Sequence, residues 1–206
     1  MLPLGDSDTA DTAARPTPGI RPHDLLSEAA RKTLRYHLQR MVAEENGTLE
    51  GTEIEALHAM RVATRRMRTA FRVFESCLDP AGVAPWIREL QRTGRRLGVV
   101  RDMDIFREKT ELYLVATPGE APTALLPLMR AWDAAHTAAR HALLDHLNSR
   151  RYLEFRQAFG ALLDTGLPHA GPRTATVSQL GRQLVHQRLD TVFSYGAPLS
   201  EPDPPL

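Results

Sequence analysis

The helical spacing of apolar residues is the feature that most constrains this chain of 206 residues. Apolar side chains recur every three to four positions from His23 almost to the end, as in amphipathic α-helices. No segment alternates polar and apolar residues over the length of a half-buried strand. The spacing predicts helices over residues 24–45, 53–78, 83–97, 103–116, 121–147, 150–165 and 175–194. The predicted fold class is therefore all-α, an antiparallel helical bundle.

The two ends of the chain differ from the helical part in composition. Residues 1–22 are rich in Pro, Thr, Asp and Gly without periodicity, so we expect a disordered tail or linker. Residues 23–195 form the expected helical domain, with Ser149 as the N-cap of its sixth helix, and residues 196–206 form a Pro-rich tail. The N-terminus lacks a signal-peptide pattern and no apolar run reaches about 18 residues, so we expect a cytoplasmic protein without a membrane span.

One predicted helix carries an unusual concentration of positive charge. The stretch HAMRVATRRMRTAFRVF, residues 58–74, contains five arginines and one histidine. Four of the arginines fall within an arc of about 60° on a helical wheel, and the histidine lies beside them. This first stripe consists of His58, Arg61, Arg65, Arg68 and Arg72. Arg66 lies outside the arc and is a flanking candidate.

The next predicted helix repeats the arrangement with a second stripe, and Arg101 follows it. The second stripe consists of Arg88, Arg92, Arg95 and Arg96. The segment from His58 to Arg101 contains ten arginines and three acidic residues. Its charge is therefore +7, although the whole chain carries only +1. A solvated face usually mixes signs because like charges one turn apart repel. We interpret the two stripes as a surface that grips a polyanion. A plain solvated face, or one that meets an acidic partner protein, remains the alternative.

Several other side chains are weaker candidates for the same surface. Arg31 and Arg35 lie on the first predicted helix, and Arg140 lies one turn after His136 on the fifth. Two carboxylates in the segment RDMD, Asp102 and Asp104, suit a structural role better than catalysis, because no further metal ligands lie at a suitable spacing. We expect Asp102 to be an N-cap and Asp104 to lie in the first turn, where they also orient Arg101.

Two motifs together resemble the signature of the CHAD family, the conserved histidine α-helical domains. The first is HAMRVATRRMR, in which Met67 stands where leucine is commoner, and the second is LGVVRDMDI. The resemblance extends over about residues 23–195. The matching residues of the first motif are His58, Arg61, Val62, Arg65, Arg66 and Arg68, and those of the second are Leu97, Gly98, Val100, Arg101, Asp102 and Asp104.

This resemblance implies an all-helical fold with a basic channel that binds inorganic polyphosphate. It also implies partners, because family members accompany triphosphate-tunnel enzymes and associate with polyphosphate granules. The family fold has two similar halves related by a pseudo-twofold axis, and a second His-x-x-Arg-Val-like helix is missing here. We therefore expect the chain to resemble the N-terminal half, as a fragment or a naturally short member. A homodimer that rebuilds the channel is an alternative.

The expected function is non-catalytic binding of polyphosphate, without a cofactor or metal. The sequence has no GxxxxGK[ST], HExxH, GxSxG or GxGxxG motif that would indicate an enzyme. A nucleic-acid-binding module is the main alternative. This alternative is disfavoured because Phe71, Phe74 and Trp86 lie on the apolar helix faces, away from the arginines. Bases held by those arginines would have no aromatic side chain to stack on.

Overall fold

The structure, a computed structural model, describes residues 17–51, 54–117, 121–170 and 174–196. These residues form helices and no strand, so the prediction of an all-α fold is confirmed. The elements are α1 (Leu26–Ala43), α2 (Glu45–Glu50), α3 (Ile54–Val73), the short 3-10 helix η1 (Glu75–Cys77), α4 (Pro80–Ala116), α5 (Ala121–Leu147), α6 (Arg150–Thr165) and α7 (Val177–Gly196).

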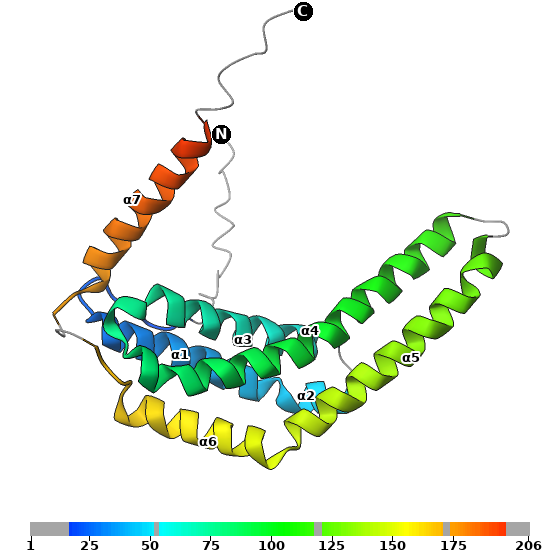
Figure 1. Cartoon of the computed structure of the whole chain (residues 1–206), viewed down its shortest axis with the longest axis horizontal. Helices are drawn as coiled ribbons and strands as arrows, with labels where there is room; N and C mark the ends of the chain where they lie inside the picture. Colours follow the sequence, from blue (N-terminus) through cyan, green and yellow to red (C-terminus); the bar gives the residue numbers. More distant parts are fainter. Residues whose placement is uncertain (1–16, 52–53, 118–120, 171–173, 197–206) are drawn as a thin grey trace, which may run out of the picture.

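The main core lies among α1, α3, α4 and α6, with Leu143 and Leu147 contributed by the end of α5 (Figure 1). Helix α3 packs between α1 and α4, and α6 contacts both α1 and α4. The second half of α4 and the first half of α5 extend from this bundle as a long hairpin, while α7 projects from the opposite end (Figure 1). The core is filled by fully buried side chains such as Leu34, Met60, Met67, Leu90 and Phe159. The bundle therefore presents one side of α3 and α4 to solvent without a covering helix.

Helix α4 corrects one prediction. The sequence indicated separate helices over residues 83–97 and 103–116, but α4 is a single helix of 37 residues. The predicted break rested on Asp102 as an N-cap, a position that aspartate favours. Leu97 and Val100 are both buried against the core on either side of Gly98, and this packing keeps the helix continuous. Asp102 and Asp104 consequently lie within α4, so the N-cap and first-turn roles predicted for them are wrong.

The helix ends that flank the bundle are capped as their residue types suggest. Ser149 was predicted as the N-cap of α6, and its side chain accepts a hydrogen bond from the backbone N–H of Tyr152 at 3.2 Å. Asp79 caps α4 by accepting bonds from the backbone N–H groups of Ala81 and Gly82. The short helix α2 was not predicted, because the segment ENGTLE reads as a connection.

The expected tails fall mostly outside the described residues. Residues 1–16 and 197–206 are not described, so the boundaries proposed at residues 22 and 196 remain predictions. Among the described helices, none combines the length and apolar character needed to cross a membrane.

A polar network lies between α2 and α6 inside the bundle. The Glu45 carboxylate is buried and accepts a 2.9 Å bond from the Tyr152 hydroxyl. It also accepts a 2.7 Å bond from Nη1 of Arg156. Burial, reinforced by the Glu45 charge, raises the pKa of Tyr152, so the phenol stays protonated and donates to the carboxylate. This network fixes the short helix α2 against the opposite side of the bundle.

His37 on α1 is a buried titratable group, with only 7% of its surface exposed. Burial, together with the charges of Arg66 and Arg40, lowers the pKa of His37 from 6.5 to about 4. The unfolded chain therefore takes up a proton on His37 as the pH falls through about 6.5, whereas the folded chain does so only near pH 4. The stability contributed by the neutral His37 imidazole is fully present above about pH 6.5. It is lost as the pH falls from there to about 4.

We expect the free energy of unfolding to fall between pH 7 and pH 4.5, with His37 contributing about 2 kcal/mol of the decrease. A His37→Leu variant should show a decrease that is smaller by about this amount, because leucine does not titrate. Urea unfolding at both pH values measures the difference. The same pH dependence in the variant and the unchanged protein would show that His37 does not carry the effect.

Candidate functional site

Helices α3 and α4 approach each other closely at two glycines of α4. A Cβ atom built on Gly98 would lie 3.6 Å from Nε of Arg61, and one built on Gly94 would lie 3.8 Å from Nη1 of Arg68. The same atom on Gly94 would lie 3.4 Å from Cγ2 of the buried Thr64. The glycines therefore leave room for arginine side chains of α3 to lie across α4. This crossing places the first arginine stripe beside the second.

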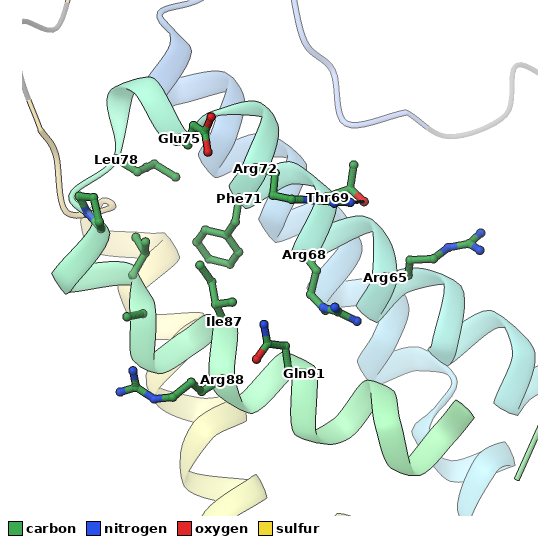
Figure 2. A pocket seen from close by; sticks show the side chains of 13 residues that line it. Arg65, Arg68, Thr69, Phe71, Arg72, Glu75, Leu78, Ile87, Arg88 and Gln91 are labelled. Carbon is green, nitrogen blue, oxygen red and sulfur yellow. Dashed lines mark hydrogen bonds between the residues drawn. The ribbon is translucent and has the colours of Figure 1, made fainter. Parts of the chain in front are cut away.

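Toward their connection the two helices enclose a groove of about 650 Å³. Figure 2 shows its side chains projecting from α3 on one side and α4 on the other. The groove is lined by Arg65, Arg68, Thr69, Phe71, Arg72, Glu75, Leu78, Pro80, Val83, Ala84, Ile87, Arg88 and Gln91. Residues from both predicted stripes thus meet at one site.

The positive charges of this groove are not neutralised within the described part of the chain. No ion pair there involves Arg65, Arg68, Arg72 or Arg88. The Arg72 guanidinium only donates a long 3.4 Å bond to the Thr69 hydroxyl. Glu75 is the one acidic residue among the lining residues. Among the lining residues, four exposed arginines and one carboxylate give a net charge of +3, which suits a multiply charged anion.

The remaining residues of the first stripe continue from the groove along α3. His58 and Arg61 are half-buried, and Nδ1 of His58 has no hydrogen-bond partner in the described residues. Arg66 is exposed but acts electrostatically on His37 of α1, which places it on the flank, as the helical wheel predicted. Arg95 is exposed on α4.

Arg92 and Arg96 line a second, smaller hollow, of about 310 Å³, where α4 meets α5 and α6. Two further side chains line this hollow and were not predicted from the sequence, His146 and Arg151. Nε2 of His146 lies 2.9 Å from the hydroxyl oxygen of Thr93. Burial lowers the pKa of His146, so it adds little positive charge near neutral pH. The second stripe is therefore divided between two sides of α4.

The charge of this second hollow is partly neutralised by Glu89. Nε of Arg151 donates to Oε1 of Glu89 at 3.0 Å, and Arg92 lies 3.8 Å from the same carboxylate. The Arg151 guanidinium holds the pKa of Glu89 below its usual value, so the carboxylate is ionised at neutral pH. Within the described residues, the arginines of the groove between α3 and α4 are therefore less neutralised by carboxylates than those of this hollow.

Arg140 has a structural role that the sequence did not reveal. Its guanidinium donates to the carbonyl oxygens of Thr48 at 3.2 Å and Leu49 at 2.9 Å, at the end of α2. Gly51 follows with a φ of 73°, and a Cβ atom there would lie 2.1 Å from Nη2 of Arg140. Only glycine suits this position, both for its backbone and for the approach of the arginine. Arg140 does not line the groove between α3 and α4, and its place in a ligand-binding surface stays a prediction.

Arg101 shares a third hollow, of about 430 Å³, with Arg140, His136 and Asp104. Its Nε atom is buried without a hydrogen-bond partner in the described residues. Within the described residues, Asp104 forms no hydrogen bond with Arg101, which it was expected to orient. It lies 2.9 Å from Nε2 of His136 and joins α4 to α5. Asp102 is exposed on α4.

Arg31 and Arg35 lie away from the groove, which corrects their assignment to it. Both guanidinium groups donate to the carbonyl oxygen of Leu163, near the end of α6. Arg31 also binds Glu28 at 2.7 Å, and Arg35 forms an ion pair with Asp164. Cations near the C-terminal carbonyls of a helix stabilise that helix, and this accounts for both residues.

Comparisons with known proteins identify a family and two similar solved structures. The family model described as "CHAD domain" matches residues 32–205. A crystal structure of the CHAD domain from the plant Ricinus communis is similar over 90% of this chain and 60% of its own, with 27% identity and a TM-score of 0.64. The structure named PptA from Streptomyces chartreusis is similar over 87% of this chain and 62% of its own, with 20% identity and a TM-score of 0.65. No curated protein matches the chain.

The chain thus spans about 60% of the length of these two solved structures. The resemblance inferred from the two sequence motifs is confirmed by the family match. The match includes both stripes and the groove between α3 and α4.

Proposed function

The chain belongs to the CHAD domain family, and from that premise we propose that it binds inorganic polyphosphate at the groove between α3 and α4. The observation that carries the proposal is that four arginines line the groove and none of them forms an ion pair within the described residues: Arg65, Arg68, Arg72 and Arg88. The family resemblance suggests the ligand, and the charge and shape of the groove suit it.

A linear phosphate chain fits this surface better than a single phosphate does. The stripe on α3 continues from the groove through Arg61 to His58, so a longer anion would contact more guanidinium groups. Each guanidinium offers paired donors that match two phosphate oxygens, and each phosphate that is neutralised releases counterions. Binding should therefore strengthen with chain length and weaken steeply with salt.

Binding without catalysis is the simplest activity that this groove supports. Phosphoryl transfer needs a group that holds or activates the nucleophile and charges that stabilise the transferred phosphoryl group. The lining supplies the charges, while its single carboxylate, Glu75, lies at the apolar end near Leu78 (Figure 2). We accordingly propose a scaffold for polyphosphate, located in the cytoplasm at polyphosphate granules. A triphosphate-tunnel enzyme or a granule protein is the proposed partner.

The test is a calorimetric titration with polyphosphate of defined length at several salt concentrations. We expect the logarithm of the affinity to fall linearly with the logarithm of salt, with a slope that reflects three or more neutralised phosphates, roughly −2 or steeper. Incubation with and without divalent metal should leave the polymer length unchanged on a gel. A flat salt dependence would contradict the proposed contacts, and steady shortening of the polymer would contradict the non-catalytic assignment.

A further inference from the structure

Helix α7 carries an apolar face that the described part of the chain leaves exposed. Its first turns are fixed to the bundle, since Val177 and Leu180 pack against the core and the backbone N–H of Val177 donates a 3.0 Å bond to the carbonyl oxygen of Asp24. Beyond these turns, α7 projects away from the other helices (Figure 1). The projecting part bears four apolar side chains that are 45–70% exposed: Val185, Leu189, Val192 and Phe193.

These four side chains, here called the α7 stripe, form one face of the helix. They fall within an arc of about 100° on a helical wheel, whereas Gln187 and Asp190 lie outside it. The arc is centred roughly 140° from Val177 and Leu180, so the stripe faces away from the side that holds α7 to the bundle. A single amphipathic helix is barely stable in water without packing. The α7 stripe therefore needs a partner surface.

The spacing of the α7 stripe is symmetric about Leu189. Val185 precedes Leu189 by four residues, and Phe193 follows it by four. When two α7 helices lie antiparallel with a twofold axis beside Leu189, each Leu189 meets its counterpart and each Val185 meets Phe193 of the other copy. The stripe is thus complementary to itself in this register, which is the property that a twofold interface requires.

The charges also match in this register. Arg182 lies on the same side of α7 as the stripe, seven residues before Leu189, and it forms no ion pair within the described residues. Gly196, the last residue of α7, lies seven residues after Leu189. In the antiparallel pair, Arg182 therefore lies beside the C-terminal carbonyl groups of the other helix, where a cation is favourable. A parallel pair would instead bring the two Arg182 side chains together.

From this symmetry we infer that a second copy of the chain covers the α7 stripe, through an antiparallel pair of α7 helices. A contact between two single helix faces lies at the low end of the size range for specific interfaces, below about 1,200 Å², so we expect a dissociation constant of roughly 1–50 μM. The inference goes beyond the proposed function and does not depend on it, because no residue of α7 lines the groove between α3 and α4.

Sedimentation equilibrium of the whole chain between about 1 and 100 μM tests the inference. We expect the mass to rise with concentration from that of one chain to that of two. Phe193→Glu introduces a charge twice into the twofold interface, so it should weaken dimerisation at least about thirtyfold. Gln187→Glu adds the same charge outside the stripe and should dimerise as the unchanged protein does. A monomer at every concentration, or equal dimerisation of the two variants, would overturn the inference.

Cysteine crosslinking tests the antiparallel register. Each variant also carries Cys77→Ser, so that the introduced thiol is the only one in the chain. A mixture of Val185→Cys and Phe193→Cys should form a disulfide between the two variants on mild oxidation. Neither variant should crosslink with itself, because identical positions are about 12 Å apart along the antiparallel pair. Crosslinking of each variant with itself, and none between the two, would indicate a parallel pair and contradict the inferred register.

Discussion

Arg68→Ala is expected to weaken polyphosphate binding by about tenfold or more, because it removes a charge-assisted hydrogen bond from the groove. Arg65→Ala should have a similar effect. Arg66→Ala removes the same formal charge from the flank of α3 and should weaken binding by less than about threefold, through long-range attraction alone. Isothermal titration with polyphosphate at low and moderate salt measures all three variants.

The comparison has an internal control, because all three arginines are exposed on one helix. Their replacement should leave the thermal unfolding midpoint nearly unchanged. Arg68→Lys should also bind more weakly than the unchanged protein, since lysine keeps the charge but loses the planar fork of donors. Equal losses at the three positions, with no difference between arginine and lysine, would indicate a diffuse basic surface in place of a defined groove.

The largest expected effect on stability comes from the network of Glu45, Tyr152 and Arg156. Arg156→Ala should lower the free energy of unfolding by about 2–3 kcal/mol, because the buried Glu45 carboxylate loses its only cationic partner in the described part of the chain. Arg150→Ala is the matched control on the same helix, since its ion pair with Glu154 is exposed and should contribute less than about 1 kcal/mol. Urea unfolding measures both variants.

The result also tests the role assigned to α2. If Arg156→Ala and Arg150→Ala lower the free energy of unfolding by the same amount, the buried network does not stabilise the contact between α2 and α6. The decrease in the free energy of unfolding caused by Tyr152→Phe should lie between those of the two variants. This change removes one neutral donor to Glu45 and leaves the salt bridge with Arg156 in place.

The helices and the arginine stripes could be predicted from sequence because both depend on local periodicity. Arg61, Arg65, Arg68 and Arg72 recur at helical spacing, and the buried Met67 and Phe71 lie on the other side of the same helix. The positions of such residues on the wheel are fixed once the segment is helical. The same reasoning placed Arg66 on the flank, where the structure has it.

The errors arose where long-range contacts decide the outcome. Arg140 donates to a carbonyl oxygen 92 residues away, and Arg35 donates to one 128 residues away. Neither pairing leaves a local signal in the sequence, so both arginines resembled free cations. Helix α4 was divided before Asp102, which was expected to be an N-cap, while the burial of Leu97 and Val100 that keeps the helix continuous is recognisable only in the fold.

The most direct measurement of the central claim is a competition assay on the whole chain. A fluorescent polyphosphate is bound first, and unlabelled polyphosphate, duplex DNA or RNA is then added at the same total phosphate concentration. We predict that unlabelled polyphosphate displaces the probe at a concentration at least tenfold lower than either nucleic acid, because the groove between α3 and α4 suits a flexible phosphate chain and has no aromatic platform among its arginines. Displacement by duplex DNA at the same phosphate concentration as polyphosphate would contradict the claim.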